Sequence, residues 1–180
     1  MASNTPSKIL QTEAEKEARL AGLYDEYFDK IARYAYARIG DRTAAEDIAG
    51  EVFLKALESL KKYEERGLPM EAWLFKIAHN QVVDHLRETT KTKTVPIETV
   101  EITDNDDPQA AAETNIEMER VTVAMKQLTG EQAEVIRLRF ISGLSSREVA
   151  ETLGKNDGAV REMQRAAMEK MRKLLNIEGS

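Results

Sequence analysis

Hydrophobic side chains recur at spacings of three and four residues along most of the chain, a period typical of amphipathic α-helices. In the first half of the sequence this pattern predicts three helices, over about 13–39, 41–63 and 69–88. Gly40 is suited to end the first helix, and Pro69 to open the third. Asp41 or Thr43 can cap the second helix, and Thr43 with Glu46 has the spacing of a capping box.

The helical period stops near residue 90 and returns near residue 108. No Lys or Arg occurs between Lys93 and Arg120, whereas acidic side chains are frequent there. Strand patterns are almost absent, apart from the short run TVPIETVEI. We therefore expect an all-α protein with four segments: a disordered lead-in (1–12), a first helical domain (13–90), a flexible acidic linker (91–107) and a second small helical domain that starts at Pro108 (108–180).

The second domain carries the spacing of a helix-turn-helix. Ser145 and Glu148 form a capping-box pair at the start of its first helix, and Gly154 can adopt the positive φ of a tight turn. Ala150 is small enough for the helices to approach, and Val160 can fill the angle between them. Further apolar positions are taken by Val149, Leu153 and Met163, and Thr129 can cap the preceding helix. The same pattern also fits an ordinary corner between two helices, so DNA binding remains one of two interpretations.

The amino-acid composition and the absence of certain motifs exclude several classes of protein. The 180 residues contain no cysteine, which excludes a disulfide framework and a Cys-ligated zinc site. No apolar run approaches membrane-spanning length, so we expect a cytoplasmic protein with no membrane insertion. His79 and His85 lack the spacing of a helical metal pair, and no nucleophile elbow or phosphate-binding loop occurs. We therefore expect no metal, no cofactor and no enzymatic activity.

The net charge of −6 argues against general affinity for nucleic acids, because phosphates are neutralised by Lys and Arg. Any DNA binding must therefore be local, or must be assisted by a partner. In the predicted recognition helix, Arg161 and Arg165 share one face, and Gln164 has the chemistry to read an adenine edge. Asp157 and Glu162 oppose this role, since carboxylates near phosphates weaken binding.

Four blocks of sequence together carry a family resemblance. In chain order they are LYDEYFDKIARYAYARIGD, AEDIAGEVFLKAL, AWLFKIAHNQVVDHLR, and LTGEQAEVIRLRFISGLSSREVAETLG followed by GAV. In this order the chain resembles the bacterial sigma factors of the extracytoplasmic-function (ECF) group, over most of its length beyond the first twenty residues. The resemblance implies a sigma-2-like bundle, a sigma-4-like helix-turn-helix domain, and function in promoter recognition and melting. It also implies two partners, promoter DNA and core RNA polymerase, which is contacted through its β′ clamp helices and β flap. Many members of the family are also held by an anti-sigma factor, and the sequence does not show whether this chain has one.

The resemblance places candidate site residues in three groups. For the promoter −10 element they are Lys62, Tyr63, Trp73, Lys76, His79, Asn80 and Arg87. For the −35 element they are Arg147, Lys155, Asn156, Asp157, Arg161, Gln164 and Arg165. For core polymerase they are Glu46, Asp47, Glu51, Phe53 and Leu54. The sequence departs from the family pattern at Glu162, where a small polar residue is usual, and at Ala166, where many members have Arg.

Asn80 is an unusual choice for the middle of a helix, because Asn is a mediocre helix former. Trp73, Lys76 and Asp84 fall on the same helical stripe. An amide can read the Watson–Crick edge of a base that has left the stack, so the resemblance implies that Asn80 reads a flipped −10 base. Trp73 is more often a core residue than a stacking platform, and Asp84 is expected to pair with Arg87 or to orient the amide.

Two other classes of protein remain open. A sigma-like decoy would bind an anti-sigma factor without binding DNA, and the acidic balance with Glu162 favours it. A stand-alone helix-turn-helix repressor would bind duplex DNA without polymerase. For a sigma factor, the acidic linker with Asp104, Asp106 and Asp107 is expected to mimic a phosphate backbone inside basic polymerase channels.

Overall fold

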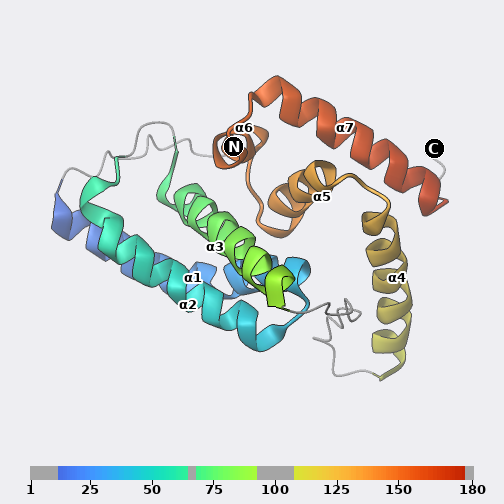
Figure 1. Cartoon of the computed structure of the whole chain (residues 1–180), viewed down its shortest axis with the longest axis horizontal. Coiled ribbons are helices and arrows are strands. Elements are labelled where there is room, and N and C mark those ends of the chain that lie inside the picture. The colour runs from blue at the N-terminus through green and yellow to red at the C-terminus, as the bar shows by residue number, and fades with distance from the viewer. Residues whose placement is uncertain (1–11, 65–67, 93–107, 177–180) are drawn as a thin grey trace.

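The computed structural model describes residues 12–64, 68–92 and 108–176, and within these ranges the chain contains helices and no strand. The fold is all-α, as the sequence predicted (Figure 1). The elements, in chain order, are α1 (Glu13–Ile39), α2 (Arg42–Ser59), the 3-10 helix η1 (Leu60–Lys62), α3 (Met70–Thr92), α4 (Pro108–Lys126), α5 (Gly130–Ile136), the π-helical turn η2 (Arg137–Ile141), α6 (Ser146–Leu153) and α7 (Asp157–Leu174). The predicted acidic linker lies outside the described residues.

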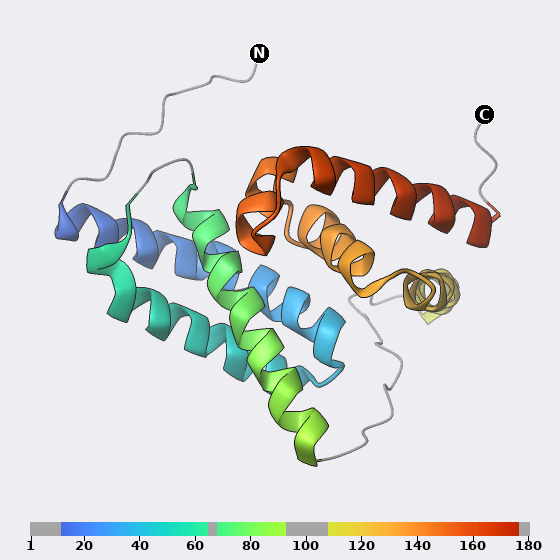
Figure 2. The same ribbon diagram turned by 45° about the horizontal axis from the view of Figure 1, so that its top comes forward.

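The first three helices form a bundle in which α1 and α2 lie side by side and α3 crosses both (Figure 2). Large apolar side chains from all three helices are fully buried, among them Leu23, Ile31, Val52, Phe75 and Val82, whereas Leu57 on α2 is 55 % exposed. Burial of side chains of this size is the main source of stability for such a bundle, at about 1.5–3 kcal/mol each.

Helix boundaries confirm part of the sequence analysis and correct part of it. Gly40 ends α1 with φ of 75°, as predicted. The cap of α2 is Asp41, whose carboxylate accepts a hydrogen bond from the backbone N–H of Ala44. The capping box predicted for Thr43 and Glu46 is therefore wrong, because both residues lie inside the helix. Once Asp41 satisfies the first-turn N–H groups, a second cap has no role.

The helix α3 continues to Thr92, about one turn beyond the predicted end. Its last turn contains Thr89 and Thr90, whose hydroxyls donate hydrogen bonds to backbone carbonyls one turn earlier. β-branched residues are weak helix formers, but these hydroxyls find partners within the helix and so do not terminate it.

The C-terminal helices form the predicted helix-turn-helix. Ser145 and Glu148 make a complete capping box, and Gly154 ends α6 with φ of 64°. Ala150 and Val160 are both buried where α6 meets α7. On the other side of α7, a second apolar cluster joins it to α4 and α5, through Ala124, Leu128, Ala133, Ile136, Ala167 and Met171.

The two halves of the chain pack directly against each other, which the sequence did not predict. The helix α6 contacts α3, and the turn η2 contacts α1 (Figure 2). Val135, Leu138 and Val149 of the second half belong to the same buried cluster as the core of the first half. One of the two buried clusters therefore extends across the two predicted domains.

Candidate nucleic-acid and polymerase interfaces

The outer surface of α3 carries the polar stripe that the sequence singled out. Lys76, Asn80, Asp84 and Arg87 are all exposed, at spacings of three and four residues. Arg87 lies 4.0 Å from the carboxylate of Asp84, which is the predicted pair. Both members are largely exposed, so the pair contributes little to stability. The amide of Asn80 thus faces solvent rather than the core, in a position from which it can meet a ligand.

Trp73 and Tyr63 form the edge of this surface. Their ring centroids are 4.8 Å apart, and Trp73 packs partly buried against the core, as the favoured interpretation predicted. Tyr63 is only 4 % exposed, and its hydroxyl donates a hydrogen bond to the backbone carbonyl of Leu68. The structure therefore gives Tyr63 a bracing role for the loop before α3, rather than the open −10 contact that was expected. Lys62 next to it is exposed.

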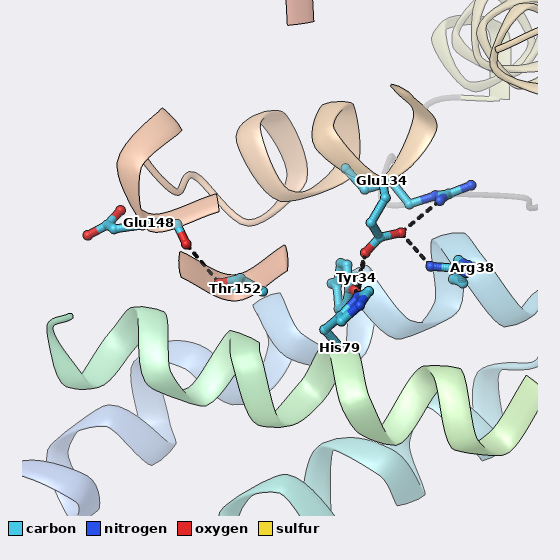
Figure 3. A network of polar contacts seen from close by, with 7 residues as sticks. Tyr34, Arg38, His79, Glu134, Glu148 and Thr152 are labelled. Atoms are coloured by element: carbon cyan, nitrogen blue, oxygen red, sulfur yellow. Dashed lines mark hydrogen bonds and ion pairs between the residues drawn. The ribbon is translucent and has the colours of Figure 1, made fainter. Parts of the chain in front are cut away.

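His79 lies on another face of α3 and points toward the second half of the chain. It belongs to a cluster that we call the interdomain network: Tyr34 and Arg38 of α1, His79 of α3, Glu134 of α5 and Arg137 of η2 (Figure 3). His79 Nδ1 is 3.1 Å from both the Tyr34 hydroxyl and Glu134 Oε1. In this conformation His79 is partly buried, with 18 % of its side chain exposed, and its Nδ1 contacts groups from both halves of the chain.

Glu134 is the centre of the interdomain network, with its side chain only 5 % exposed. Tyr34 donates its hydroxyl hydrogen to Glu134 Oε1. On the other oxygen, Arg38 Nη1 lies 2.5 Å and Arg137 Nη1 3.0 Å from Oε2. The carboxylate thus receives donors from both halves of the chain.

The electrostatics of the interdomain network keep Glu134 ionised. Burial raises the pKa of Glu134, but hydrogen bonding from His79 and the charge of Arg38 outweigh it, and the pKa falls to about 2. Burial and the neighbouring Glu134 carboxylate raise the pKa of Tyr34 well above its usual value. Tyr34 therefore remains a donor, and Glu134 an acceptor, throughout the neutral range.

The predicted polymerase-binding helix, α2, borders an apolar groove of about 600 Å³ between α1 and α2. Tyr24, Leu54 and Leu57 line it with about half of their surface exposed. Phe53, a predicted polymerase contact, is only 7 % exposed and packs against the Tyr24 ring at a centroid distance of 5.0 Å. Phe53 therefore forms part of the groove wall rather than a protruding contact.

The predicted acidic contacts Glu46, Asp47 and Glu51 are exposed on α2. Asp47 and Glu51 share the helical stripe that continues to Leu54. Leu54 of the groove thus shares one stripe of α2 with two carboxylates, a combination that suits a partner surface with apolar and basic groups.

The recognition helix α7 presents arginines that are already paired with acids. Arg161 bonds to Asp157 one turn earlier. Arg165 lies 2.6 Å from Glu162 and 3.3 Å from Glu169. Hydrogen bonding from Arg165 lowers the pKa of Glu162, so this acid is charged at neutral pH. The outer face of α7 therefore alternates in charge and is not uniformly basic.

Other predicted −35 residues have roles inside the C-terminal half. Asn156 caps α7 by accepting a hydrogen bond from the Ala159 N–H at 2.7 Å. Lys155 forms an ion pair with Glu131 at 2.7 Å. Gln164, expected to face outward, accepts a hydrogen bond from Arg139 Nε at 2.9 Å and is only partly exposed. Arg147 is exposed on α6.

The sequence analysis missed the interdomain network. The signal available was Glu134 itself, a carboxylate between Ala133 and Val135 and four residues before Leu138, in an otherwise apolar stretch. A buried acid implies a cationic or donating partner. No local spacing, however, predicts that the partners of this acid come from α1 and α3.

Among the described residues, no group of three or more acidic, His or Cys side chains is placed to hold a metal ion. None of the helices in the described ranges is both long and apolar enough to span a bilayer.

Two family models match the chain, and they match its two halves. Sigma-70 region 2 matches residues 23–92, which include α2 and α3, and Sigma-70 region 4 matches residues 124–173, which include the helix-turn-helix. The chain is 33 % identical over 149 residues to the ECF RNA polymerase sigma factor SigD of Mycobacterium tuberculosis, over 79 % of this chain and 70 % of SigD. The chain belongs to the ECF sigma factors.

This sigma factor has further relatives among the ECF sigma factors. It is 34 % identical over 158 residues to the ECF RNA polymerase sigma factor BldN of Streptomyces coelicolor, a match that covers 85 % of this chain and 59 % of BldN. With SigL of Mycobacterium tuberculosis it shares 27 % identity over 175 residues, which cover 96 % of this chain and 98 % of SigL. The chain thus spans a little under two thirds of BldN and nearly all of SigL.

Solved structures support the fold of the ECF sigma factor. The chain matches CnrH, solved with the cytosolic domain of CnrY, with a TM-score of 0.66 and 23 % identity, over 93 % of this chain and 96 % of CnrH. It matches RpoE of Bartonella quintana, solved with the anti-sigma factor NepR, with a TM-score of 0.71 and 22 % identity, over 89 % of this chain and 99 % of RpoE.

Proposed function

We propose that this ECF sigma factor binds core RNA polymerase in the cytoplasm, directs it to particular promoters and helps to melt the −10 element. The observation that carries the proposal is the occurrence of both sigma regions in one chain, with an exposed polar stripe on α3 and a helix-turn-helix at α6 and α7. A stand-alone repressor needs only the second of these features. The chain performs no covalent chemistry in this role.

Asn80 is assigned to the reading of an unstacked −10 base. Its exposed amide offers donors and an acceptor that suit a Watson–Crick edge. Lys76 precedes it by one turn, Arg87 follows it by two, and both are exposed for contacts with phosphates. Trp73 supports this surface from its partly buried position beside Tyr63. His79 joins the site once it leaves the interdomain network.

The groove between α1 and α2 is assigned to core polymerase. Leu54 and Leu57 are more than half exposed beside it, and exposed apolar groups of this kind mark protein interfaces. The carboxylates of Glu46, Asp47 and Glu51 lie on the same helix. The polymerase supplies the general attraction to phosphates that a chain with a net charge of −6 lacks.

The −35 element is assigned to the helix-turn-helix, with Arg161 and Arg165 toward bases or phosphates. The RpoE relative of known structure was solved with an anti-sigma factor, and we infer a partner of this class for the present chain. A bound anti-sigma factor would withhold the chain from polymerase until a signal releases it.

Transcription with purified core polymerase and a promoter library tests the proposal. The chain should direct discrete transcripts from a subset of promoters and should bind duplex DNA weakly when polymerase is absent. Tight binding to duplex DNA without polymerase would support a repressor. If neither transcripts nor duplex binding is seen, while an anti-sigma factor binds, the chain is a decoy.

A further inference from the structure

The contact between the two halves of the chain places two predicted DNA-reading elements side by side. Cα atoms of α6 and α3 approach within 8 Å, and α7 begins a few residues after α6 ends. The −10 and −35 promoter elements are separated by about 25 base pairs, which corresponds to about 85 Å of duplex. A helix of 18 residues such as α7 is only about 27 Å long. The observed arrangement cannot contact both elements at once.

We propose that the described structure is a closed form, in which the interdomain network latches the helix-turn-helix half onto α1 and α3 and holds the chain away from promoter DNA. This inference rests on the proposed function, because the promoter sets the distance that the two halves must span. The 15 residues between α3 and α4 can extend to at most about 50 Å, so the chain is long enough to separate its halves.

The latch also occupies a residue that the open form would use. His79 was assigned to the −10 element, yet its Nδ1 lies 3.1 Å from Glu134 Oε1 and is enclosed between the two halves (Figure 3). Release of Glu134 frees His79 and uncovers this face of α3. Opening thus adds His79 to a −10 surface whose Lys76, Asn80 and Arg87 are already exposed.

The contact between the halves combines buried apolar side chains, among them Val135, Leu138 and Val149, with the polar interdomain network. When the halves separate, water can solvate Glu134, Arg38 and Tyr34, and these groups then lose little. While the halves are closed, the removal of one partner leaves the others buried without their counter-charge, which is strongly unfavourable. Glu134 holds contacts with α1 and α3 on one side and with its neighbour Arg137 on the other. Glu134 is therefore the polar side chain whose removal should weaken closure most.

The distance between the halves tests the latch directly. The chain contains no cysteine, so Glu58→Cys on α2 and Arg172→Cys on α7 can carry a donor and an acceptor dye at two exposed positions of the full-length chain. The labelled chain should show one short distance. Glu134→Gln, and more strongly Glu134→Lys, should raise the ratio of open to closed chains by at least about tenfold.

Glu131→Gln is the matched control, since Glu131 lies on the same helix but pairs only with Lys155 of its own half. It should leave the distance unchanged. Circular dichroism checks that each variant keeps its helices, and Tyr34→Phe provides a second variant, which removes only the hydroxyl from the opposite side of the latch. A short distance in Glu134→Gln, Glu134→Lys and Tyr34→Phe alike would overturn the proposal. So would a long distance in the unmodified chain.

A transcription assay on the same samples separates this inference from the proposed function. Added core polymerase and promoter DNA should shift the labelled chain to the long distance. If Glu134→Gln opens the chain but no variant supports transcription, the latch stands and the proposed function fails. If the chain transcribes but Glu134→Gln and Glu134→Lys remain closed, the function stands and the latch fails.

Discussion

At the scale of the residue, Glu134 is the side chain whose role differs most between sequence and structure. In the sequence it is one acid among many, whereas in the structure it is 4 % exposed and accepts hydrogen bonds from both halves of the chain. Its pKa of about 2 reflects partners that offset the cost of burial. The stability of the closed form should therefore depend on the ionisation of the Glu134 carboxyl group.

The pH dependence of stability should reveal this coupling. Because the pKa of Glu134 falls from 4.5 to about 2 on closure, its ionised form stabilises the closed chain above pH 4.5, by about 3 kcal/mol. This contribution is lost as the pH falls toward 2. Urea unfolding of the unmodified chain and of Glu134→Gln should therefore differ most near neutral pH, and the difference should shrink between pH 4.5 and pH 3.

The comparison of Glu131→Gln with the unmodified chain serves as the control. Glu131 is 67 % exposed in its side chain, so its removal should change stability little at any pH. A difference for Glu134→Gln that stays constant, or grows, as the pH falls would contradict the assigned ionisation.

At the scale of the element, α7 combines a recognition-helix position with an unusual charge pattern. Arg165 is shared between Glu162 and Glu169, and Arg161 is bonded to Asp157. Each arginine shares its charge with an acid, which weakens its attraction to a phosphate or a guanine. We therefore expect α7 to bind DNA weakly without polymerase, which agrees with the low overall affinity expected for an acidic chain.

Substitution of Glu162 tests this account of α7. Glu162→Gln removes one carboxylate from the DNA side and releases one partner of Arg165. In the holoenzyme, the variant should bind a −35 duplex about two- to fivefold more tightly, in line with the energy of an exposed ion pair. Glu119→Gln, an exposed acid on α4, should have no effect. Weaker binding by Glu162→Gln would instead indicate that Glu162 itself contacts a base, as acids do at cytosine.

Local signals allowed much of the element structure to be predicted from the sequence. Gly40, Gly154 and the Ser145–Glu148 pair act within a few residues of chain, so their spacing is sufficient to place helix ends. The candidate site was less predictable. The aromatic ring of Tyr63 is of a kind that stacks on bases, but it is buried beside Trp73 of α3. No local sequence pattern predicts this contact between two helical segments.

The packing of one half against the other was also beyond the sequence. Contacts such as Tyr34 with Glu134 join residues 100 positions apart, and no periodicity of a single helix reports them. Gln164 illustrates the same limit. It faces outward on a helical wheel, but its side chain accepts a hydrogen bond from Arg139.

At the scale of the whole molecule, the polymerase groove and the interdomain latch lie on different parts of the first bundle. The groove is lined by α1 and α2, whereas the latch uses α1 and α3. Polymerase can therefore dock on the groove of a closed chain, and opening can follow on the enzyme. This order would keep the free chain away from DNA until it has joined polymerase.

The groove assignment predicts the outcome of a charge placed within it. Leu54→Asp should weaken the binding of core polymerase by about tenfold or more, because it puts a second carboxylate beside Glu51 and removes an apolar contact. The matched control is Ile116→Asp on α4, since Leu54 is 57 % and Ile116 60 % exposed. Fluorescence anisotropy of the labelled chain with core polymerase measures both. Equal affinity for the two variants would rule out the groove as the docking surface.

The central claim is that this chain is an initiation factor that reads a melted −10 element through Asn80. Its most direct test is promoter-dependent transcription with core polymerase, with unmodified chain, with Asn80→Ala and with the control Gln127→Ala, an exposed amide on the turn after α4. The unmodified chain and Gln127→Ala should give the same promoter-specific transcripts, and Asn80→Ala should give at least about tenfold fewer. Equal transcript yields and unchanged promoter choice with Asn80→Ala would contradict the claim.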